Sequence, residues 1–352
     1  MKATNNLDNL VLEYARYWLN SLNNYIIRID KYQCYVAGGN NGPHNALETP
    51  VRNTAHVLEA LRCIQKAGIR VDMDVIIGLE GWLLSCGFFK DGAYLARQSA
   101  GDHVNGVIGP AWVIQALVTT PTAIRYKELH QRSELLASKL TFDKRSRLWK
   151  RFDPFTHKES IDYTLDHQIW LAASLASAGF NTDIKAFMDG LLDNKNMYFR
   201  DNGRFHHIAR DRTFKNTLLN YKYEHSGEHI SDVENGYHMY HLFALALIYK
   251  YNGHHALFDT CNFHRSISYL EDNFDLIMDS TYGTSYNNPG LSFPLIYKIF
   301  GDYFSISEAD VISRVKQSLR ASSGLESDLI PWGNCDPVTS YSRYYELFLS
   351  LH

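Results

Sequence analysis

Three stretches of this sequence open with clusters of acidic, amide, histidine and tyrosine side chains and then become almost wholly apolar. A helix start needs one capping oxygen, so capping alone does not account for three or four polar groups at each start. These side-chain types donate, remove and hold protons in acid–base catalysis. We therefore expect the catalytic residues among Asp102, His103, Asn105, Asp162, Tyr163, Asp166, His167, Asn235, Tyr237 and His238.

The bias toward amide, histidine and tyrosine favours removal of a proton next to the carboxylate of a uronic acid. This reaction needs amides or cations that stabilise the carboxylate in its enolate form, together with a general base and a general acid. The sequence thus predicts a polysaccharide lyase that cleaves an acidic polysaccharide by β-elimination. The candidates are Asn105, Asn235 and Arg52 for the carboxylate, His103, His167 or His238 for the base, and Tyr163 or Tyr237 for the acid.

Other functions stay open for the same residues. Hydrolysis of a glycosidic bond uses two carboxyl groups roughly 5 to 10 Å apart, which Asp102 with Asp162 or Asp166 would supply. C5-epimerisation of a uronate begins like elimination and differs in where the second proton transfer goes. A sugar-binding module without catalysis would release no product. A terpene cyclase is not favoured, because the sequence has neither a DxDD nor a DDxxD motif.

Further residues are expected to hold the substrate. Aromatic rings stack on sugar rings, and basic side chains attract an anionic chain. Asn288 and Asp336 also lie where helix N-caps belong, because each directly precedes a proline. The predicted substrate-binding residues are Arg52, Asn53, Trp149, Arg151, Arg204, Glu234, Asn288, Tyr341 and Arg343.

Two kinds of helical segment alternate along the chain. One kind is apolar nearly all round, which is typical of burial on all sides; these segments are 49–68, 105–120, 162–179, 234–253, 288–301 and 336–352. The other kind repeats apolar residues at i, i+3, i+4 and i+7, the stripe of a helix with one buried face. These segments are 7–26, 73–88, 123–140, 183–194, 264–279 and 307–320.

This alternation predicts an all-α fold in which six helical hairpins close into a ring, an (α/α)6 toroid that forms a single domain over residues 1–352. The N-terminal ends of the inner helices would then meet at one mouth. Gly68, Gly179, Gly253 and Gly301 mark helix ends. The long connections 142–161 and 196–211 are expected to form small β-hairpins at the mouth, where sites are usually built.

The amino-acid composition argues against several classes of binding partner. Hydrophobic residues make up 45% of the 352 residues and charged residues 21%, which is typical of a folded globular protein. The net charge of −3 provides no basic field, so we expect no nucleic-acid partner. We expect no membrane partner, no cofactor and no metal, because long apolar runs, nucleotide motifs and clustered cysteines are missing. The N-terminus lacks a signal-peptide pattern, which predicts a cytoplasmic location unless export follows another route.

The segments DYTLDHQIWLAASLA and ENGYHMYHLFALALIY resemble helices of the (α/α)-toroid carbohydrate-active enzymes. This group includes polysaccharide lyases of the alginate and heparin type, glucuronyl C5-epimerases, unsaturated glucuronyl hydrolases and N-acylglucosamine 2-epimerases. NGVIGPAWVIQAL is similar to proteins of bacterial polysaccharide gene clusters. The resemblance covers about residues 45–350 and implies the toroid fold and a sugar polymer as substrate.

Overall fold

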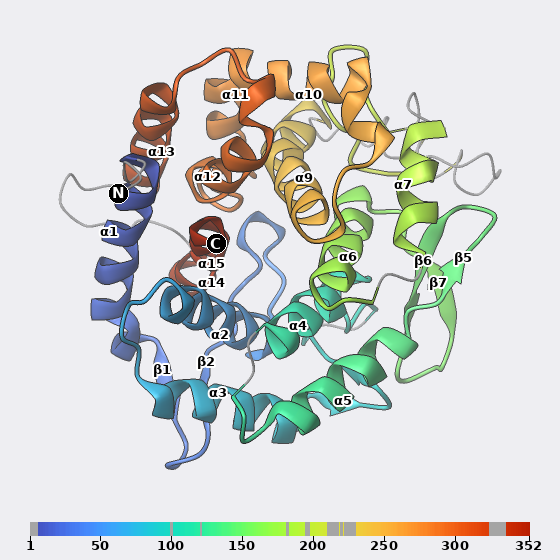
Figure 1. The fold of residues 1–352 in the computed structure, drawn as a ribbon. Coiled ribbons are helices and arrows are strands. Elements are labelled where there is room, and N and C mark those ends of the chain that lie inside the picture. Colours follow the sequence, from blue (N-terminus) through green and yellow to red (C-terminus); the bar gives the residue numbers. More distant parts are fainter. Residues whose placement is uncertain are drawn as a thin grey trace.

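In a computed structural model the chain forms a ring of helices around a central axis (Figure 1). The structure describes residues 6–98, 101–119, 122–180, 183–193, 198–209, 218, 221, 230–323 and 336–352. Within these residues no helix has the length and apolar character needed to cross a membrane. Helices dominate the described chain, and its strands belong to small antiparallel sheets.

The inner ring consists of the segments that are apolar nearly all round. Each is buried along almost its whole described length, because it contacts neighbouring inner helices on both sides and an outer helix behind. This burial confirms the predicted inner barrel. The helices are α2 (Val51–Lys66), α4 (Ile108–Val118), α6 (Leu165–Ser177), α9 (Ile230–Asn252), α12 (Pro289–Phe300) and the pair α14 (Pro337–Ser342) and α15 (Tyr345–Phe348).

The outer ring wraps this barrel with helices that bury one face. In α10, for example, Phe263, Ile267 and Leu270 are buried, and the opposite face is exposed. The observed bounds match the predicted one-sided segments. The outer helices are α1 (Asn6–Ser21), α3 (Met73–Ser85), α5 (Tyr126–Ser138), α7 (Ile184–Asp193), α10 (Cys261–Asp272) with α11 (Phe274–Asp279), and α13 (Glu308–Ser323).

The two ends of the chain close the ring. The amide of Leu7 in α1 donates to Glu308 of α13 at 2.9 Å. The indole of Trp18 stacks on the ring of Tyr341 at 4.7 Å and donates to its carbonyl at 3.0 Å. The predicted substrate-binding residue Tyr341 is therefore part of the buried ring closure. Contacts between successive helical hairpins and contacts between the two ends of the chain together close the (α/α)6 toroid, as predicted.

Most of the predicted helix boundaries are formed by the expected capping residues. The side chain of Asn288 accepts from the amide of Gly290 at 2.8 Å, and that of Asp336 accepts from Thr339 at 3.3 Å. Gly68 has a φ of 84° directly after α2, where a left-handed residue ends a helix. Gly301 differs, because its φ is −53° and the chain continues into a short 3-10 helix, Gly301–Tyr303. Gly301 still marks the end of α12, as predicted, because it is the C-cap residue that follows Phe300.

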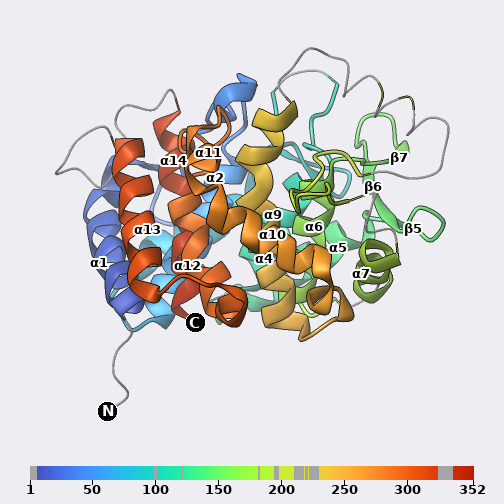
Figure 2. The ribbon, with the colours of Figure 1, turned by 90° about the horizontal axis from the view of Figure 1, so that it is seen from above.

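The predicted hairpin segments form small sheets at the mouth. Strands β5 (Phe142–Asp143), β6 (Leu148–Phe152) and β7 (Glu159–Ile161) pair in that order. In the second segment Phe199 bridges Phe205 around a turn that contains Gly203. Figure 2 shows β6 and β7, the start of α9 and the connection before α2 on the same upper side of the ring. The inner-helix N-termini therefore open toward these connections.

Candidate functional site

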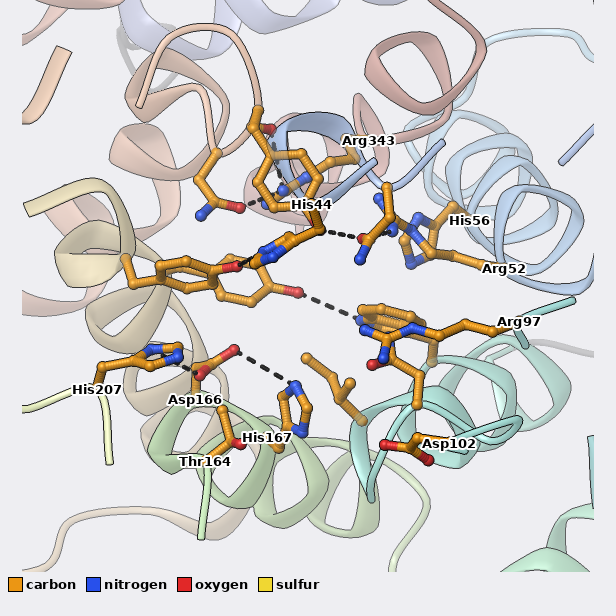
Figure 3. Close-up of a pocket in the computed structure, with 18 residues that line it drawn as sticks. His44, Arg52, His56, Arg97, Asp102, Thr164, Asp166, His167, His207 and Arg343 are labelled. Carbon is orange, nitrogen blue, oxygen red and sulfur yellow. Dashed lines mark hydrogen bonds and ion pairs between the residues drawn. The ribbon is translucent and has the colours of Figure 1, made fainter. Parts of the chain in front are cut away.

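A cavity of about 230 Å³ lies at the mouth of the inner barrel. Its walls come from the starts of α2, α4, α6 and α9 and from the connections that enter them (Figure 3). Several predicted residues converge here from segments far apart in the sequence. The predicted residues that line it are Arg52, Asp102, Asn105, Asp166, His167, Tyr237 and Arg343.

His167 is oriented by a carboxylate that precedes it at the start of α6. Its Nδ1 lies 2.8 Å from Asp162 Oδ2, which also accepts from the amide of Val107 at 2.9 Å. Burial disfavours the ionised carboxyl, but His167 and the amide donors outweigh it and lower the pKa of Asp162 to about 2. An ionised Asp162 requires a proton on Nδ1 of His167, which leaves Nε2 to exchange protons with a ligand in the cavity.

Asp166 lies between two imidazoles of this wall. Its Oδ2 is 4.0 Å from Nε2 of His167, and its Oδ1 is 3.6 Å from Nδ1 of His207. Burial lowers the pKa of His167, yet the Asp162 and Asp166 carboxylates outweigh it, so the pKa is raised. Burial lowers the pKa of His207. The neighbouring carboxylates therefore make His167 the more basic of the two imidazoles.

A tyrosine and a histidine face the cavity from another wall. Tyr237 Oη and His44 Nε2 share a hydrogen bond of 2.7 Å. Burial, with the Tyr286 phenol adding to it, raises the pKa of Tyr237 well above its ordinary value of 10.0. Burial, with Arg97 adding to it, lowers the pKa of His44 to about 4. Both groups are thus neutral near pH 7 and able to pass a proton between them.

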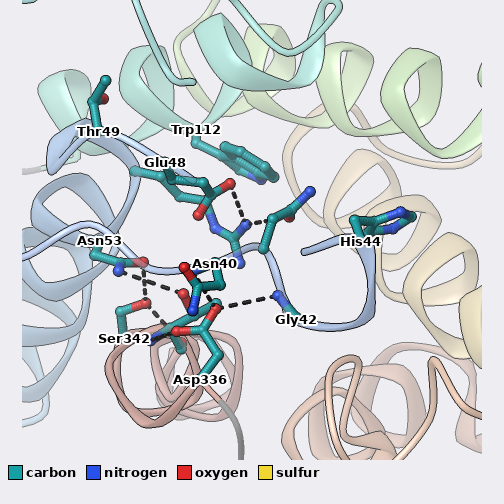
Figure 4. A network of polar contacts seen from close by, with 12 residues as sticks. Asn40, Gly42, His44, Glu48, Thr49, Asn53, Trp112, Asp336 and Ser342 are labelled. Carbon is teal, nitrogen blue, oxygen red and sulfur yellow. Dashed lines mark hydrogen bonds and ion pairs between the residues drawn. The ribbon is translucent and has the colours of Figure 1, made fainter. Parts of the chain in front are cut away.

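The loop that carries His44 is anchored to the far end of the chain (Figure 4). Asp336 Oδ2 accepts from the amides of Asn40 at 2.9 Å and Gly42 at 3.2 Å. A Cβ at Gly39 would lie 2.1 Å from the Thr339 hydroxyl and 2.5 Å from Asp336 Oδ1, so only glycine fits there. Asp336 is an N-cap, as its sequence position indicates, and it also places His44 at the cavity.

Two arginines of the cavity wall are already paired with acids. Arg52 Nη1 lies 2.8 Å from Glu48 Oε1, and its guanidinium lies over the Trp112 ring at 4.8 Å. Arg343 Nη2 lies 2.7 Å from Glu346 Oε1. These buried pairs hold the guanidinium groups in place at the cavity wall.

The floor of the cavity is aromatic. The His56 ring stacks on Tyr345 at 4.3 Å and meets the edge of Trp112 at 5.3 Å. Trp112 Nε1 in turn donates to Tyr240 Oη at 3.3 Å. Burial and the charges of Arg52 and Arg343 lower the pKa of His56 well below its ordinary value. His56 is therefore a neutral group in the lining of the cavity.

Four predicted residues lie outside the cavity. Three of them are on α9, and the fourth is in the hairpin beside it. His238 Nε2 lies 2.9 Å from the carbonyl of Ser266, and Asn235 Oδ1 accepts from Arg204 at 3.1 Å. Glu234 is fully buried and ion-paired with Arg200 at 2.8 Å and Arg204 at 3.1 Å. Glu234 and His238 share one face because they are four residues apart. The structure therefore places Glu234, Asn235, His238 and Arg204 in packing contacts outside the cavity.

Other predicted residues also serve the scaffold. Trp149 is buried against Phe142 and Phe187 in the base of the sheet. Asn53 donates to the carbonyl of Ala37 at 2.9 Å, and Asn288 caps α12. Tyr163 and Tyr341 pack against the hydrophobic core.

His103 and Arg151 line a second cavity of about 340 Å³ beside the first. Arg151 Nη1 lies 3.0 Å from Asp102 Oδ2, and Asp102 lines both cavities. The ring of His103 lies 4.7 Å from that of Phe155. Among the described residues, no three or more His, Cys, Asp or Glu side chains are arranged to hold a metal ion.

Several site residues that were not predicted from the sequence lie in irregular connections. His44, Arg97 and His207 line the cavity, but no helical periodicity or motif spacing marks them. His44 lies in the turn-rich run GGNNGPHN, whose glycines and asparagines indicate an ordered loop. That run was the one sequence signal that could have drawn attention to it.

No family model matches this sequence. A curated relative, "Archaeal glycosylation protein Q" from Haloferax volcanii, is 26% identical over 344 residues, covering 88% of this chain and 90% of that protein. Cellobiose 2-epimerase from Bacillus thermoamylovorans matches the structure with a TM-score of 0.58 at 10% identity, over 97% of this chain and 99% of that one. A glycoside hydrolase family 76 mannosidase from Bacteroides thetaiotaomicron matches with a TM-score of 0.52 at 10% identity, over 97% and 98%. These likenesses show the toroid fold.

Proposed function

We propose that this chain is a carbohydrate-processing enzyme that moves a proton on a sugar bound in the mouth of the toroid. The chain is similar to a protein named for glycosylation, and its fold is shared with an epimerase and a mannosidase that act on sugars. The reaction that we favour is epimerisation, with elimination as the variant in which a leaving group departs instead.

The observation that carries this proposal is the presence of two separate acid–base pairs around one small cavity. His167 is held by Asp162 on one wall, and Tyr237 is bonded to His44 on another (Figure 3). Epimerisation requires one group to remove a proton from a carbon and another group to return a proton to its opposite face. His167 Nε2 would take the first role and the Tyr237–His44 pair the second.

The cavity volume favours epimerisation over cleavage inside a polymer. About 230 Å³ is at the small end for ligand pockets, which suits one sugar residue, free or at the end of a chain. Elimination would use the same groups, with Tyr237 protonating the departing oxygen. The acidic character of the sugar, expected from the sequence, is part of this proposal.

Hydrolysis is less well supported by the carboxyl groups of the site. Asp162 is held by His167 and by the amides of Val107 and Thr164, with a pKa of about 2, so it is a poor proton donor. Asp102 is paired with Arg151 and accepts from the amide of Gly106. Of these three carboxyl groups, Asp166 has neither an arginine nor an amide donor among the described residues, and its contacts are the imidazoles of His167 and His207. Glycoside hydrolysis uses two carboxyl groups.

The test is proton exchange in heavy water. The protein is incubated with uronic acids and neutral hexoses, each both free and at the end of a short oligosaccharide, and the sugars are examined by NMR and mass spectrometry. We expect one carbon-bound hydrogen to be replaced by deuterium in one class of sugar. His167→Asn should abolish the exchange and Tyr237→Phe should abolish formation of the epimer, whereas the matched control His254→Asn, at a surface pair with Asp259, should do neither.

Two outcomes would contradict epimerisation. Sugar products with an absorbance near the unsaturated-uronate band would identify elimination instead. Saturated fragments of hydrolytic mass that still form in His167→Asn would overturn the proton-transfer proposal altogether.

A further inference from the structure

We propose that Arg97 binds the carboxylate of a uronic acid, so that the proton moved in the cavity is the one on the carbon next to that carboxylate. This inference rests on the proposed function and names its substrate class. It makes Arg97 the residue that selects an acidic sugar over a neutral one.

Arg97 is held rigidly at the cavity although it lies outside any helix. It follows strand β4 (Ala93–Tyr94), and its amide donates to the carbonyl of His103 at 2.9 Å. Its backbone also bridges to Glu48, in the segment that enters α2. The guanidinium points into the cavity wall in Figure 3. Such anchoring suits a group that must hold a ligand in one orientation.

The charge of Arg97 is unpaired among the described residues. None of their carboxylates lies within 4.0 Å of its nitrogens, and its buried Nε has no hydrogen-bond partner. The backbone of Arg97 pairs with that of Glu48, but the Glu48 carboxylate forms its ion pair with Arg52, at 2.8 Å. Asp102, which lines the same cavity, forms an ion pair with Arg151 at 3.0 Å. A partly buried guanidinium without an anion loses hydration that a ligand carboxylate would replace.

Carboxylate is the anion that this arrangement fits best. A guanidinium offers a planar fork of donors that matches a carboxylate with two parallel hydrogen bonds. The other two arginines of the cavity, Arg52 and Arg343, are already neutralised by Glu48 and Glu346. Arg97 thus offers one guanidinium without an acidic partner, which matches a single carboxylate, whereas a phosphate ester carries more negative charge than this one group offsets.

The position of Arg97 connects binding with proton transfer. Its positive charge lowers the pKa of His44 and opposes the raised pKa of His167, so it lies within electrostatic reach of both acid–base groups. A carboxylate held on Arg97 would bring its neighbouring carbon toward both groups. The titratable and charged groups that face His44 are Arg97, Asp166, His167, His207, Tyr237, Tyr282 and Tyr286.

The proton balance of the step closes without a co-reactant. His167 Nε2 removes the proton from the carbon next to the carboxylate, and the electron pair of that C–H bond moves into the carboxylate. Arg97 stabilises the added negative charge on the oxygens, where an aligned cation is most effective. Tyr237 then donates its proton to the opposite face of the same carbon. The resulting phenolate regains a proton from solvent by way of His44, and His167 releases the proton that it removed to solvent, so both groups return to their starting states.

The test compares sugars that differ only in the carboxylate. Binding of glucuronic, galacturonic and mannuronic acids and of the matching neutral hexoses is measured by calorimetry for the wild type, Arg97→Gln and Arg97→Lys. We expect Arg97→Gln to weaken binding of the preferred uronic acid by about 10- to 100-fold, with smaller loss in Arg97→Lys. Arg28→Gln, which breaks a surface pair with Asp72, is the matched control and should bind as the wild type does.

Each outcome separates this inference from the proposed function. Deuterium exchange into neutral hexoses at the rate seen for uronic acids would overturn the role of Arg97 and leave the proton-transfer function intact. Uronate binding that depends on Arg97 without exchange in any sugar would support the binding role and overturn the proton-transfer function. Unchanged uronate affinity in Arg97→Gln, with a wild-type circular dichroism spectrum, would overturn the inference.

Discussion

Asp162 and His167 are five residues apart at the start of α6, and a 2.8 Å hydrogen bond joins Oδ2 of the first to Nδ1 of the second. The same carboxylate accepts from Val107, at the start of the neighbouring inner helix α4, and from Thr164. Asp162 therefore ties two inner helices together at the mouth and fixes the tautomer of the proposed base. Loss of this one carboxylate should affect both chemistry and packing.

Removal of the Asp162 charge should lower the rate with a small change in substrate affinity. In Asp162→Asn the amide can no longer hold the imidazole as the Nδ1–H tautomer, so we expect kcat to fall by roughly 10²- to 10⁴-fold. The exchange assay measures this rate. Asp143→Asn is the control, because Asp143 accepts bonds from the amide and hydroxyl of Ser146 and lines neither cavity. A rate within twofold of the wild type in Asp162→Asn would contradict the orienting role.

The pH dependence of the rate should report the raised pKa of His167. A base must be deprotonated, so the rate of the wild type should rise with pH through a value above 6.5, the ordinary pKa of histidine. Without the Asp162 charge the pKa of His167 falls, and the rising limb in Asp162→Asn should move to lower pH. The measurement is kcat/KM against pH for both proteins. If kcat/KM rises at the same pH in the wild type and in Asp162→Asn, the group that titrates is not His167.

Both activity and stability should require a glycine at position 106, next to Asp162 and His167. Its φ is 58°, and a Cβ there would lie 2.0 Å from Asp162 Oδ2 and 2.5 Å from His167 Nδ1. Gly106→Ala is expected to abolish exchange and to destabilise the protein by more than the roughly 1 to 2 kcal/mol that a left-handed alanine costs. Gly68→Ala is the matched control, since φ is 84° but no atom lies within 4 Å of the added Cβ. Thermal unfolding and the exchange assay should separate the two variants.

Asp336 should support activity through the loop that carries His44. Asp336→Ala removes acceptors for Asn40, Gly42 and Thr339, so we expect a loss of about 1 to 3 kcal/mol in unfolding free energy and a lower rate. Asp72→Ala removes an N-cap from α3, far from the cavity lining. That control should lose about 1 kcal/mol and keep its rate. Equal rates in both variants would argue against the loop being coupled to the site.

Glu59 should make stability fall as the pH rises. Burial raises its pKa to about 7, from an ordinary value of 4.5, so the folded state holds the proton more tightly than the unfolded state does. Its stabilising contribution is complete below pH 4.5 and is lost as the pH rises toward 7, by roughly 3 kcal/mol in total. Denaturant unfolding at pH 5 and pH 7 should show this slope in the wild type and a flatter one in Glu59→Gln.

The helical ring could be predicted from the sequence because its signals are local. Helices that are apolar all round must be buried, and helices with one apolar stripe must cover them. Segments such as 162–179 and 264–279 showed this contrast, and the structure confirms it in α6 and in α10 with α11. The convergence of polar clusters at one mouth followed from the ring itself.

The composition of the site depended on the tertiary structure. Tyr237 and His238 are adjacent on α9, an inner helix that is buried on all sides, so its hydrophobic pattern does not indicate which face meets the cavity. A rotation of about 100° between neighbours places Tyr237 at the cavity and His238 against the outer helix α10. Periodicity therefore located the helix but not its inward face.

The sequence by itself determined the ring, its alternation of buried and half-exposed helices, and the polar helix starts that line one mouth. The tertiary structure decided which of those side chains meet, and it added His44, Arg97 and His207 from irregular connections. Loops have no repeating pattern, so their course is set by long-range contacts such as that of Asp336 with the residues before His44. Local pattern specifies helices, whereas a site assembled from distant segments needs the packed chain.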